Sequence, residues 1–385
     1  MLRGSAAWGQ AASAPVVHLQ SPPICLNVSE QWDKLHTKNY SFTGILRSDA
    51  LTLENLRELT ACRAQAYDNS SVTAEERLSW IQRYLALLTN FAGKAAAMDG
   101  NNEEALQFEW TSPLAGVPSA FSKVKGVIAE QAMACITYAA ALEDQACALA
   151  HELAQQDLEE LRNLPEQHAA AAALYRRAAG VYEHASKEYV SQLTGAKQAD
   201  RPAELRQDMV TALSKMAQGQ AQAIFAHRAQ VKNTTPSALA SLYCGAIDLF
   251  EEASAVLKSS KDVKQTAESL RKVLALSSSY NRVKGWQAMA AHQAAQSDMG
   301  VACADLQEAR RLAQESCEVA QGNSHWQQAF QQQIDVINQQ LLVYDRERQV
   351  VYFQAIARHG SQLPQGKVLV RVMDFEPLKL QHELG

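Results

Sequence analysis

Residues 215–229 read KMAQGQAQAIFAHRA, and residues 236–253, after a short break, read PSALASLYCGAIDLFEEA. An α-helix turns about 100° per residue, so residues three and four apart share a face. In the first stretch and the turns before it, one stripe has this spacing: Leu205, Met209, Leu213, Met216, Gln220 and Ile224. The stripe of the second stretch is Leu239, Tyr243, Ala246, Phe250, Ala253 and Leu257. Both stretches are therefore predicted helices.

Each of these helices also has apolar residues away from its main stripe. Phe225 lies about 150° from the centre of the first stripe, on a face shared with Gln218, Gln222 and Ala229. The following helix has a second stripe of Leu242, Leu249 and Val256. Two interpretations stay open: both extra faces are buried against neighbouring helix pairs, or one is a hydrophobic groove that accepts a partner's helix.

Proline and capping patterns extend the helical prediction to most of the chain. Pro165, Pro202 and Pro236 each precede a periodic segment, and no proline occurs between Pro236 and Pro364. Proline is tolerated in the first turn of a helix and disrupts its interior. A Thr73/Glu76 capping box opens another segment. Nine helices are predicted, at about 51–66, 73–100, 119–161, 165–193, 202–229, 236–257, 262–296, 298–320 and 324–353.

Only the two ends have short β-like runs, namely PVVHLQ (15–20), ICLNV (24–28), FTGIL (42–46) and KVLVRVMDF (367–375). Together with the helices they predict an all-α solenoid of helix pairs with a small N-terminal sheet, although no exact repeat of about 34 residues is present. The expected organisation is a flexible leader at 1–14 and a single domain at 15–380. Within that domain we expect mainly strands in 15–48, helices in 49–356 and an extended segment in 357–380 that packs back.

Composition excludes several classes of function. The 385 residues are 47% hydrophobic, which suffices for a packed core. The net charge of −5 is well mixed, so no nucleic acid partner is expected. The longest apolar run, residues 133–142, is too short to cross a membrane, and the seven scattered cysteines fit reduced core thiols. A cytoplasmic protein is expected, since one arginine in the leader gives only slight support for an organelle transit peptide.

Motifs for catalysis are missing from the sequence. It has no His-Glu-x-x-His, no Gly-x-Ser-x-Gly and no phosphate-binding glycine loop. His168, His184 and His227 could approach one another across neighbouring helices, but no carboxylate or cysteine stands at ligand spacing. Surface or interface histidines are therefore favoured over a metal site. No enzyme activity, metal or cofactor is predicted.

The last predicted helix has a stripe of Trp326, Phe330, Ile334, Ile337, Leu341 and Tyr344. Such a stripe could form a coiled-coil seam for dimerisation, but it lasts under three heptads. Packing against the preceding helices is favoured.

Several motifs together resemble the BRO-type domain family of Alix-like, ESCRT-associated proteins. They are FEWTSPLAGVPS (108–119), ALYRRAAGVYEHASKEY (173–189) and the Gln220-Ala221-Gln222 of the opening stretch. The ending, residues 346–377, is most similar to the small stand-alone Brox-like members. The similarity spans about residues 15–380.

This resemblance implies a banana-shaped, tetratricopeptide-like solenoid without enzyme activity. It also implies binding of an amphipathic C-terminal helix of an ESCRT-III subunit, in endosomal sorting, multivesicular body formation or membrane remodelling. A cytoplasmic protein recruited to endosomes is expected, and peripheral association with the endosomal membrane is compatible with this role. The alternative is a helical scaffold for another trafficking or cytoskeletal partner without ESCRT-III binding.

The resemblance also implies which residues bind the partner helix. Phe225, Ala238 and Leu242 fall on positions of the family's ESCRT-III-binding patch, and Leu249 follows on the same stripe. Ala238 stands where a larger aliphatic residue is usual. The Alix pattern has lysines that meet an acidic helix where this chain has Ala169 and Ala173.

Two further features modify this expectation. Arg176 and Arg177 are close enough to take the place of the missing lysines. Binding is therefore expected to be weakened or altered in specificity. The chain ends in residues 382–385 without a prenylation box, so lipid anchoring by that route is not expected.

Overall fold

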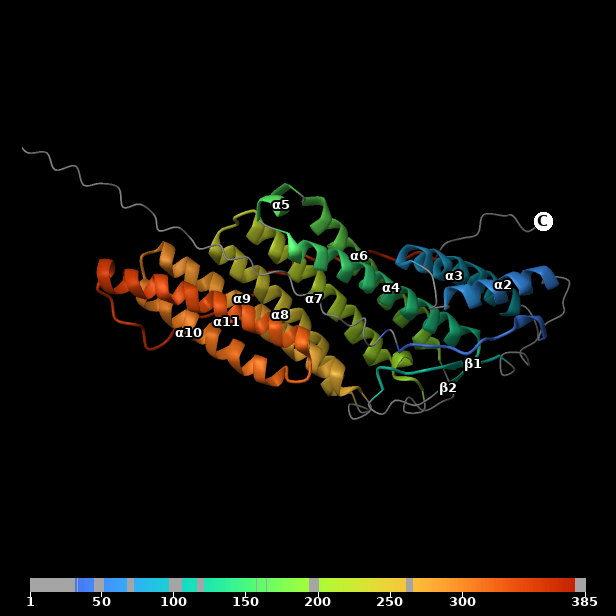
Figure 1. Cartoon of the computed structure of the whole chain (residues 1–385). Helices are drawn as coiled ribbons and strands as arrows, with labels where there is room; N and C mark the ends of the chain where they lie inside the picture. Colours follow the sequence, from blue (N-terminus) through green and yellow to red (C-terminus); the bar gives the residue numbers. More distant parts are fainter. Residues whose placement is uncertain are drawn as a thin grey trace, which may run out of the picture.

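The structure is a computed structural model that describes residues 32, 34–44, 52–67, 73–96, 106–115, 121–156, 158–163, 165–193, 201–260 and 266–377. Figure 1 shows an elongated helical body with α2, α3 and the sheet at one end and α10 and α11 at the other. Its α-helices are α2 (Leu53–Ala66), α3 (Ala74–Ala96), α4 (Val127–Gln155), α5 (Leu158–Asn163), α6 (Pro165–His184), α7 (Gln207–Val231), α8 (Pro236–Ser259), α9 (Glu268–Ala295), α10 (Met299–Val319) and α11 (Ser324–Glu347).

Five short turns complete the helical elements of the described residues. Three are 3-10 turns, η1 (Phe42–Gly44), η4 (Val190–Gln192) and η6 (Ala203–Leu205). Two are π-helical turns, η3 (Ala185–Tyr189) and η8 (Arg348–Tyr352), which prolong α6 and α11 respectively.

Consecutive long helices pack as neighbours from α6 to α11, and α4 packs on α6. The apolar stripes predicted from the sequence form these contacts. In α11, Phe330 and Ile337 are fully buried. The apolar stripe of α11 therefore packs against other helices of the same chain, as the sequence favoured. The capping box before α3 is confirmed, because the Glu76 amide donates to Thr73 Oγ1 at 3.2 Å and the Thr73 amide donates to Glu76 Oε2 at 3.0 Å. The all-α prediction is confirmed.

The small sheet is formed by residues that the sequence did not indicate. Strand β1 (Gln107–Trp110) pairs antiparallel with β2 (Ser122–Lys125), with Phe108 opposite Val124. The prediction of one helix over 119–161 is therefore wrong, since α4 begins only at Val127. Both strands have just four residues, and buried Phe108 and Val124 alternate with exposed Gln107 and Lys125.

None of the four predicted strands is seen as a strand in the described part of the chain. PVVHLQ and ICLNV lie outside the described residues. In FTGIL, Phe42–Gly44 is a 3-10 turn, and residues 367–375 are extended but pair with no strand among the described residues. Nearer the sheet, Thr37 forms an isolated bridge with Trp110.

A buried carboxylate holds the sheet to the helices. Glu130 of α4 accepts from Arg63 Nε and Tyr84 OH at 2.9 Å each, and from Trp110 Nε1 at 2.8 Å. A buried charge is costly unless it is paired and hydrogen-bonded. The three donors come from α2, α3 and β1, so this group fixes the end of the solenoid where the sheet lies.

A second buried glutamate of α4 has a different environment. Glu143 accepts from Trp32 Nε1 at 3.3 Å and from Tyr182 OH at 3.1 Å, and it forms no ion pair with a cation of the described residues. Burial raises the pKa of Glu143 to about 8. The folded protein therefore keeps this carboxyl protonated at pH values where the unfolded chain has lost the proton.

We expect Glu143 to lower stability as pH rises. Its folded pKa lies above the unfolded value of 4.5, so its contribution is intact below pH 4.5 and declines up to about pH 8, by at most about 1.4 kcal/mol per pH unit. Urea unfolding of Glu143→Gln at several pH values should show a weaker decline than the wild type. Glu183→Gln, at a partly exposed glutamate, serves as the control. Equal pH slopes for Glu143→Gln and wild type would contradict the assignment.

After η8 the chain runs back over the helices as an extended segment, residues 354–377, which we call the strap. Part of it is the red trace between α6 and α3 in Figure 1. Its backbone amides donate to helix carbonyls one after another: Ala357 to Gly300 O, Lys367 to Ser241 O and Met373 to Arg176 O, at 3.1, 2.8 and 3.3 Å. The strap thus crosses α10, α8 and α6 in turn.

Glycines allow this close approach. A Cβ on Gly245 of α8 would lie 2.5 Å from the Lys367 carbonyl oxygen, and one on Gly180 of α6 would lie 1.8 Å from that of Met373. Gly219 has another purpose: a Cβ there would meet the Phe250 ring at 2.8 Å. It makes room for a side chain of α8, whereas the strap requires the other two glycines.

We expect Gly245→Ala to push the strap away from α8. The added methyl group has backbone atoms, and no flexible side chain, in its way, so a loss of about 1–3 kcal/mol in unfolding free energy is expected. Trypsin should also cleave faster after Lys367. Gly93→Ala is the matched control, because a Cβ at that exposed helical site meets nothing within 4 Å, and it should be neutral or stabilising by up to about 1 kcal/mol. Equal denaturation midpoints and cleavage rates in the two variants would show that Gly245 is not required.

Candidate functional site

The strap and the predicted partner-binding residues share one face of the solenoid. Residues seven apart on a helix differ by only about 20° in direction. Ala238 lies seven residues before Gly245, and Ala173 seven before Gly180, the two glycines under the strap. On α7, Phe225 lies one turn after Gln222, which also touches the strap.

These residues also lie on one side of the strap. Helices α6 and α7 are antiparallel, since Ser214 Oγ donates to Ala179 O near one end and His168 meets His227 near the other. Helix α8 again runs opposite to α7. Ala173 and Ala238 precede the crossings on their helices and Phe225 follows the crossing on its own, so all three fall on the same side. We call Ala169, Ala173, Phe225 and Ala238 the candidate surface.

Burial differs among the predicted residues. Ala169 and Ala238 are exposed, and Ala173 and Phe225 are half-buried. Phe225 packs against a cluster that includes Tyr175, Ile224 and the strap residue Val370. Its face is thus part surface and part core.

Two predicted residues are not presented to a partner. Leu242 is 6% exposed and packs with Ala226 and Tyr243, and Leu249 is 3% exposed. Leu249 also lies beyond Gly245, on the far side of the strap from Ala238. The structure does not bring Leu249 together with the candidate surface, because the stripe that it continues is divided by the strap.

The two arginines of α6 are partly engaged within the chain. Arg176 Nε donates to the strap carbonyl of Arg371 at 2.7 Å, and Arg177 Nη2 donates to Tyr138 OH at 2.9 Å. Neither forms an ion pair with a carboxylate in the described part of the chain. Arg176 therefore keeps its charge beside the candidate surface while it holds the strap.

Gln222 is the central residue that sequence reasoning did not assign to the site. Its fully buried amide donates to Leu242 O at 3.1 Å and Lys367 O at 2.9 Å, and accepts from the Leu369 amide at 2.9 Å. It joins α7, α8 and the strap at one point. The only signal in the sequence is a repeated glutamine on the face away from the main stripe.

We expect Gln222→Leu to lower the unfolding free energy by about 1–3 kcal/mol, because it leaves the buried Leu242 carbonyl and the partly buried backbone groups of Lys367 and Leu369 without their partner. Hydrogen exchange of the Leu369 amide should accelerate in this variant. Gln218→Leu is the control, since that amide donates to the Ser214 side chain of its own helix. If both variants protect the Leu369 amide equally, Gln222 does not hold the strap.

A buried histidine pair lies beside the candidate surface. His168 Nε2 and His227 Nδ1 are 2.9 Å apart and the rings are stacked. Both are buried where α6 meets α7, so His168 and His227 do approach one another across neighbouring helices, at an interface and not at the surface, whereas His184 meets Tyr189 and Phe375. Burial, His168 and Lys284 hold the pKa of His227 well below its usual value. No set of three metal-ligating side chains gathers among the described residues.

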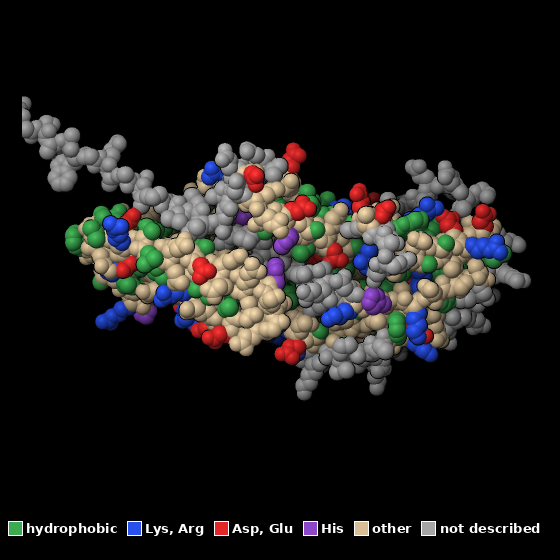
Figure 2. All heavy atoms as spheres, viewed as in Figure 1, with side chains coloured by type: hydrophobic (Ala, Val, Ile, Leu, Met, Phe, Trp, Pro, Cys, Tyr) green, Lys and Arg blue, Asp and Glu red, His purple; other side chains and the backbone are tan. Residues whose placement is uncertain are grey.

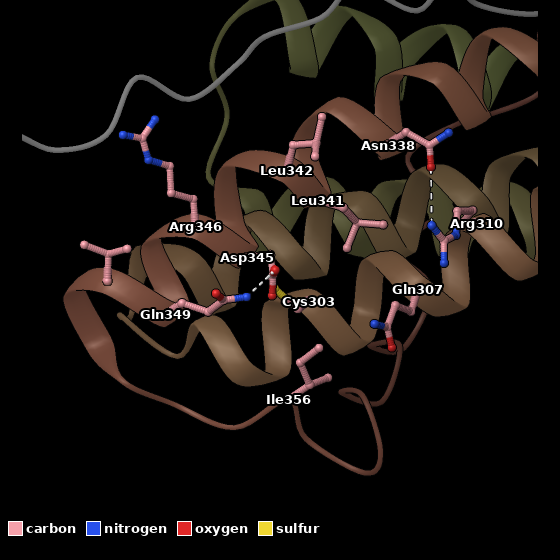
Figure 3. A pocket seen from close by; sticks show the side chains of 11 residues that line it. Cys303, Gln307, Arg310, Asn338, Leu341, Leu342, Asp345, Arg346, Gln349 and Ile356 are labelled. Carbon is pink, nitrogen blue, oxygen red and sulfur yellow. Dashed lines mark hydrogen bonds between the residues drawn. The ribbon is translucent and has the colours of Figure 1, made fainter.

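A separate hollow of about 640 Å³ lies at the opposite end, between α10 and α11. Figure 3 shows Arg310 bonded to Asn338 inside it and Leu342 and Arg346 along the outer side of α11. Leu342 is 74% exposed. None of the predicted partner-binding residues lines this hollow.

Charges of both signs are mixed on the face that Figure 2 shows. On the face seen in Figure 2, lysine and arginine side chains are interspersed with aspartate and glutamate along the whole length. Among the described helices, none combines the length and hydrophobicity needed to cross a membrane.

An elongated array of antiparallel helices with a two-stranded sheet at one end defines the class of helical solenoids. The chain belongs to the BRO1-like domain family, whose model matches residues 46–383. No curated protein matches the chain.

Solved structures have the same fold. The BRO1 domain of ALIX in a complex with CHMP4C is 18% identical with a TM-score of 0.69, over 90% of this chain and 96% of that one. ALIX bound to the SIVmac239 PYKEVTEDL late domain is 18% identical with a TM-score of 0.67, and the match covers 89% of this chain and 48% of the ALIX chain. A Bro1 domain described as a basis for endosomal targeting is 11% identical with a TM-score of 0.64, over 88% and 91% of the two chains. The predicted solenoid with a small sheet is confirmed.

Proposed function

We propose that this chain is a non-enzymatic, ESCRT-associated adaptor that binds the amphipathic C-terminal helix of an ESCRT-III subunit on its strap face. The observation that carries the proposal is the common placement of Ala169, Ala173, Phe225 and Ala238 on one face and on one side of the strap. These residues come from three helices, so they were brought together by the fold. A partner helix docks on such a surface through anchors at helical spacing.

The comparisons support the choice of partner. The similar ALIX domain is in a complex with CHMP4C, and the similarity covers nearly all of both chains. The Bro1 structure described for endosomal targeting supports a place in endosomal sorting, multivesicular body formation or membrane remodelling. The proposed adaptor is cytoplasmic and is recruited to endosomes by its partner.

The surface has small side chains, which favours a particular fit. Ala169 and Ala238 are exposed and Ala173 is half-buried, so a partner helix can approach the backbones of α6 and α8 closely. Phe225 is the one large apolar side chain of the candidate surface. It would be the main anchor, since a few aromatic or aliphatic residues carry most of the binding energy at an interface.

A second candidate function is a scaffold for another trafficking or cytoskeletal partner. The alanines at 169, 173 and 238 favour it, because they provide neither charge nor bulk to an acidic ESCRT-III helix. A panel of ESCRT-III tail peptides separates the two functions: no binding by any member would favour this second candidate.

We expect a labelled peptide of the CHMP4C C-terminal helix to bind the wild-type chain in fluorescence anisotropy. Phe225→Ala should raise Kd about 5- to 30-fold, equivalent to about 1–2 kcal/mol for the loss of an anchor. Ala238→Glu, at an exposed position, should weaken binding of an acidic helix without affecting the core. Leu342→Asp is the control for an exposed leucine at the other end. Unchanged binding in both Phe225→Ala and Ala238→Glu would exclude the candidate surface.

A further inference from the structure

The geometry points to a direct role for the strap: we propose that it forms one edge of the partner-helix surface and contacts the bound helix through Leu369 and Met373. This inference rests on the proposed function, because it concerns the same partner. It adds two residues from a distant part of the sequence to a surface otherwise formed by α6, α7 and α8.

Exposure identifies these residues. Leu369 is 51% exposed and Met373 37%, whereas Val370 between them is only 8% exposed. In extended chain, successive side chains point to opposite sides. Leu369 and Met373 therefore face away from the helices while Val370 is buried beneath.

The exposed strap residues adjoin the candidate surface. Val370 belongs to the same hydrophobic cluster against which Phe225 packs. The Leu369 amide is bonded to Gln222, one turn from Phe225, and the Met373 amide is bonded to the Arg176 carbonyl, one turn from Ala173. The apolar strip on the strap thus runs beside the candidate surface from α7 to α6.

The strap is also ordered before any partner arrives. Its amides at Lys367, Leu369 and Met373 all donate to groups of the helices. Two of its carbonyls, at Lys367 and Arg371, accept from Gln222 and Arg176. A binding edge held in this way loses little conformational entropy on association.

Charge on the strap fits an acidic amphipathic helix. Lys367 and Arg371 are exposed, and neither pairs with a carboxylate among the residues that the structure describes. They flank Leu369, with the Arg176 guanidinium bonded beneath Arg371. The strap therefore adds cations to the one that Arg176 of α6 provides beside the candidate surface. The acidic residue Asp374 comes after Met373 in the chain, where the strap continues toward α4.

The test measures binding of the labelled CHMP4C helix peptide to the full chain. Leu369→Asp should raise Kd at least about tenfold, and Arg371→Glu should raise it several-fold with a weaker dependence on salt. Leu342→Asp, with a still more exposed leucine on α11, should change Kd less than twofold. Thermal melting verifies that each variant is folded, and Leu369→Ser replaces Leu369→Asp if the charge lowers the melting temperature.

A photo-crosslinker at the same positions gives an independent readout. Benzoylphenylalanine at position 369 should cross-link to the peptide, and at position 342 it should not. If Phe225→Ala weakens binding but neither Leu369 variant does, and position 369 gives no cross-link, the strap is not part of the surface and the proposed function stands. If the wild-type chain binds neither this peptide nor any other ESCRT-III tail peptide of the panel, both the proposed function and this inference are wrong.

Discussion

An extended segment that crosses helices without joining a sheet must find partners for its backbone amides and carbonyls. Unpaired backbone groups near a protein core cost free energy comparable to a lost hydrogen bond. Here the partners are helix carbonyls, where a glycine lets the backbones meet, and the side chains of Gln222, Arg176 and Asp305. The strap's route, and with it the boundary of the proposed binding surface, depends on these few contacts.

The helices could be predicted from the sequence because their signals are local. Thr73 and Glu76 are three residues apart and form the expected cap, and α11 buries the stripe that its periodicity indicated. Strands β1 and β2 could not be recognised, because four residues with exposed polar neighbours give little periodicity. Their burial depends on Glu130 and its donors from distant parts of the chain.

The candidate site was predictable in part for the same reason. The position of Phe225 away from the main stripe of α7 is a property of one helix, and it correctly indicated a second face. Whether Leu242 and Leu249 reach solvent depends instead on what packs against α8, and the cluster that buries Leu242 includes Ala226 of α7. The periodicity of one helix contains no information about which residues of another helix cover it.

The strap changes how this solenoid folds. Contacts between consecutive helices join residues that are near in sequence, which favours rapid, stepwise folding. The bond from Arg176 to the Arg371 carbonyl spans 195 positions. Helices α6 to α8 can therefore pack together during synthesis, before the strap has left the ribosome. The strap can complete the face that these helices form only after its own residues have been synthesised.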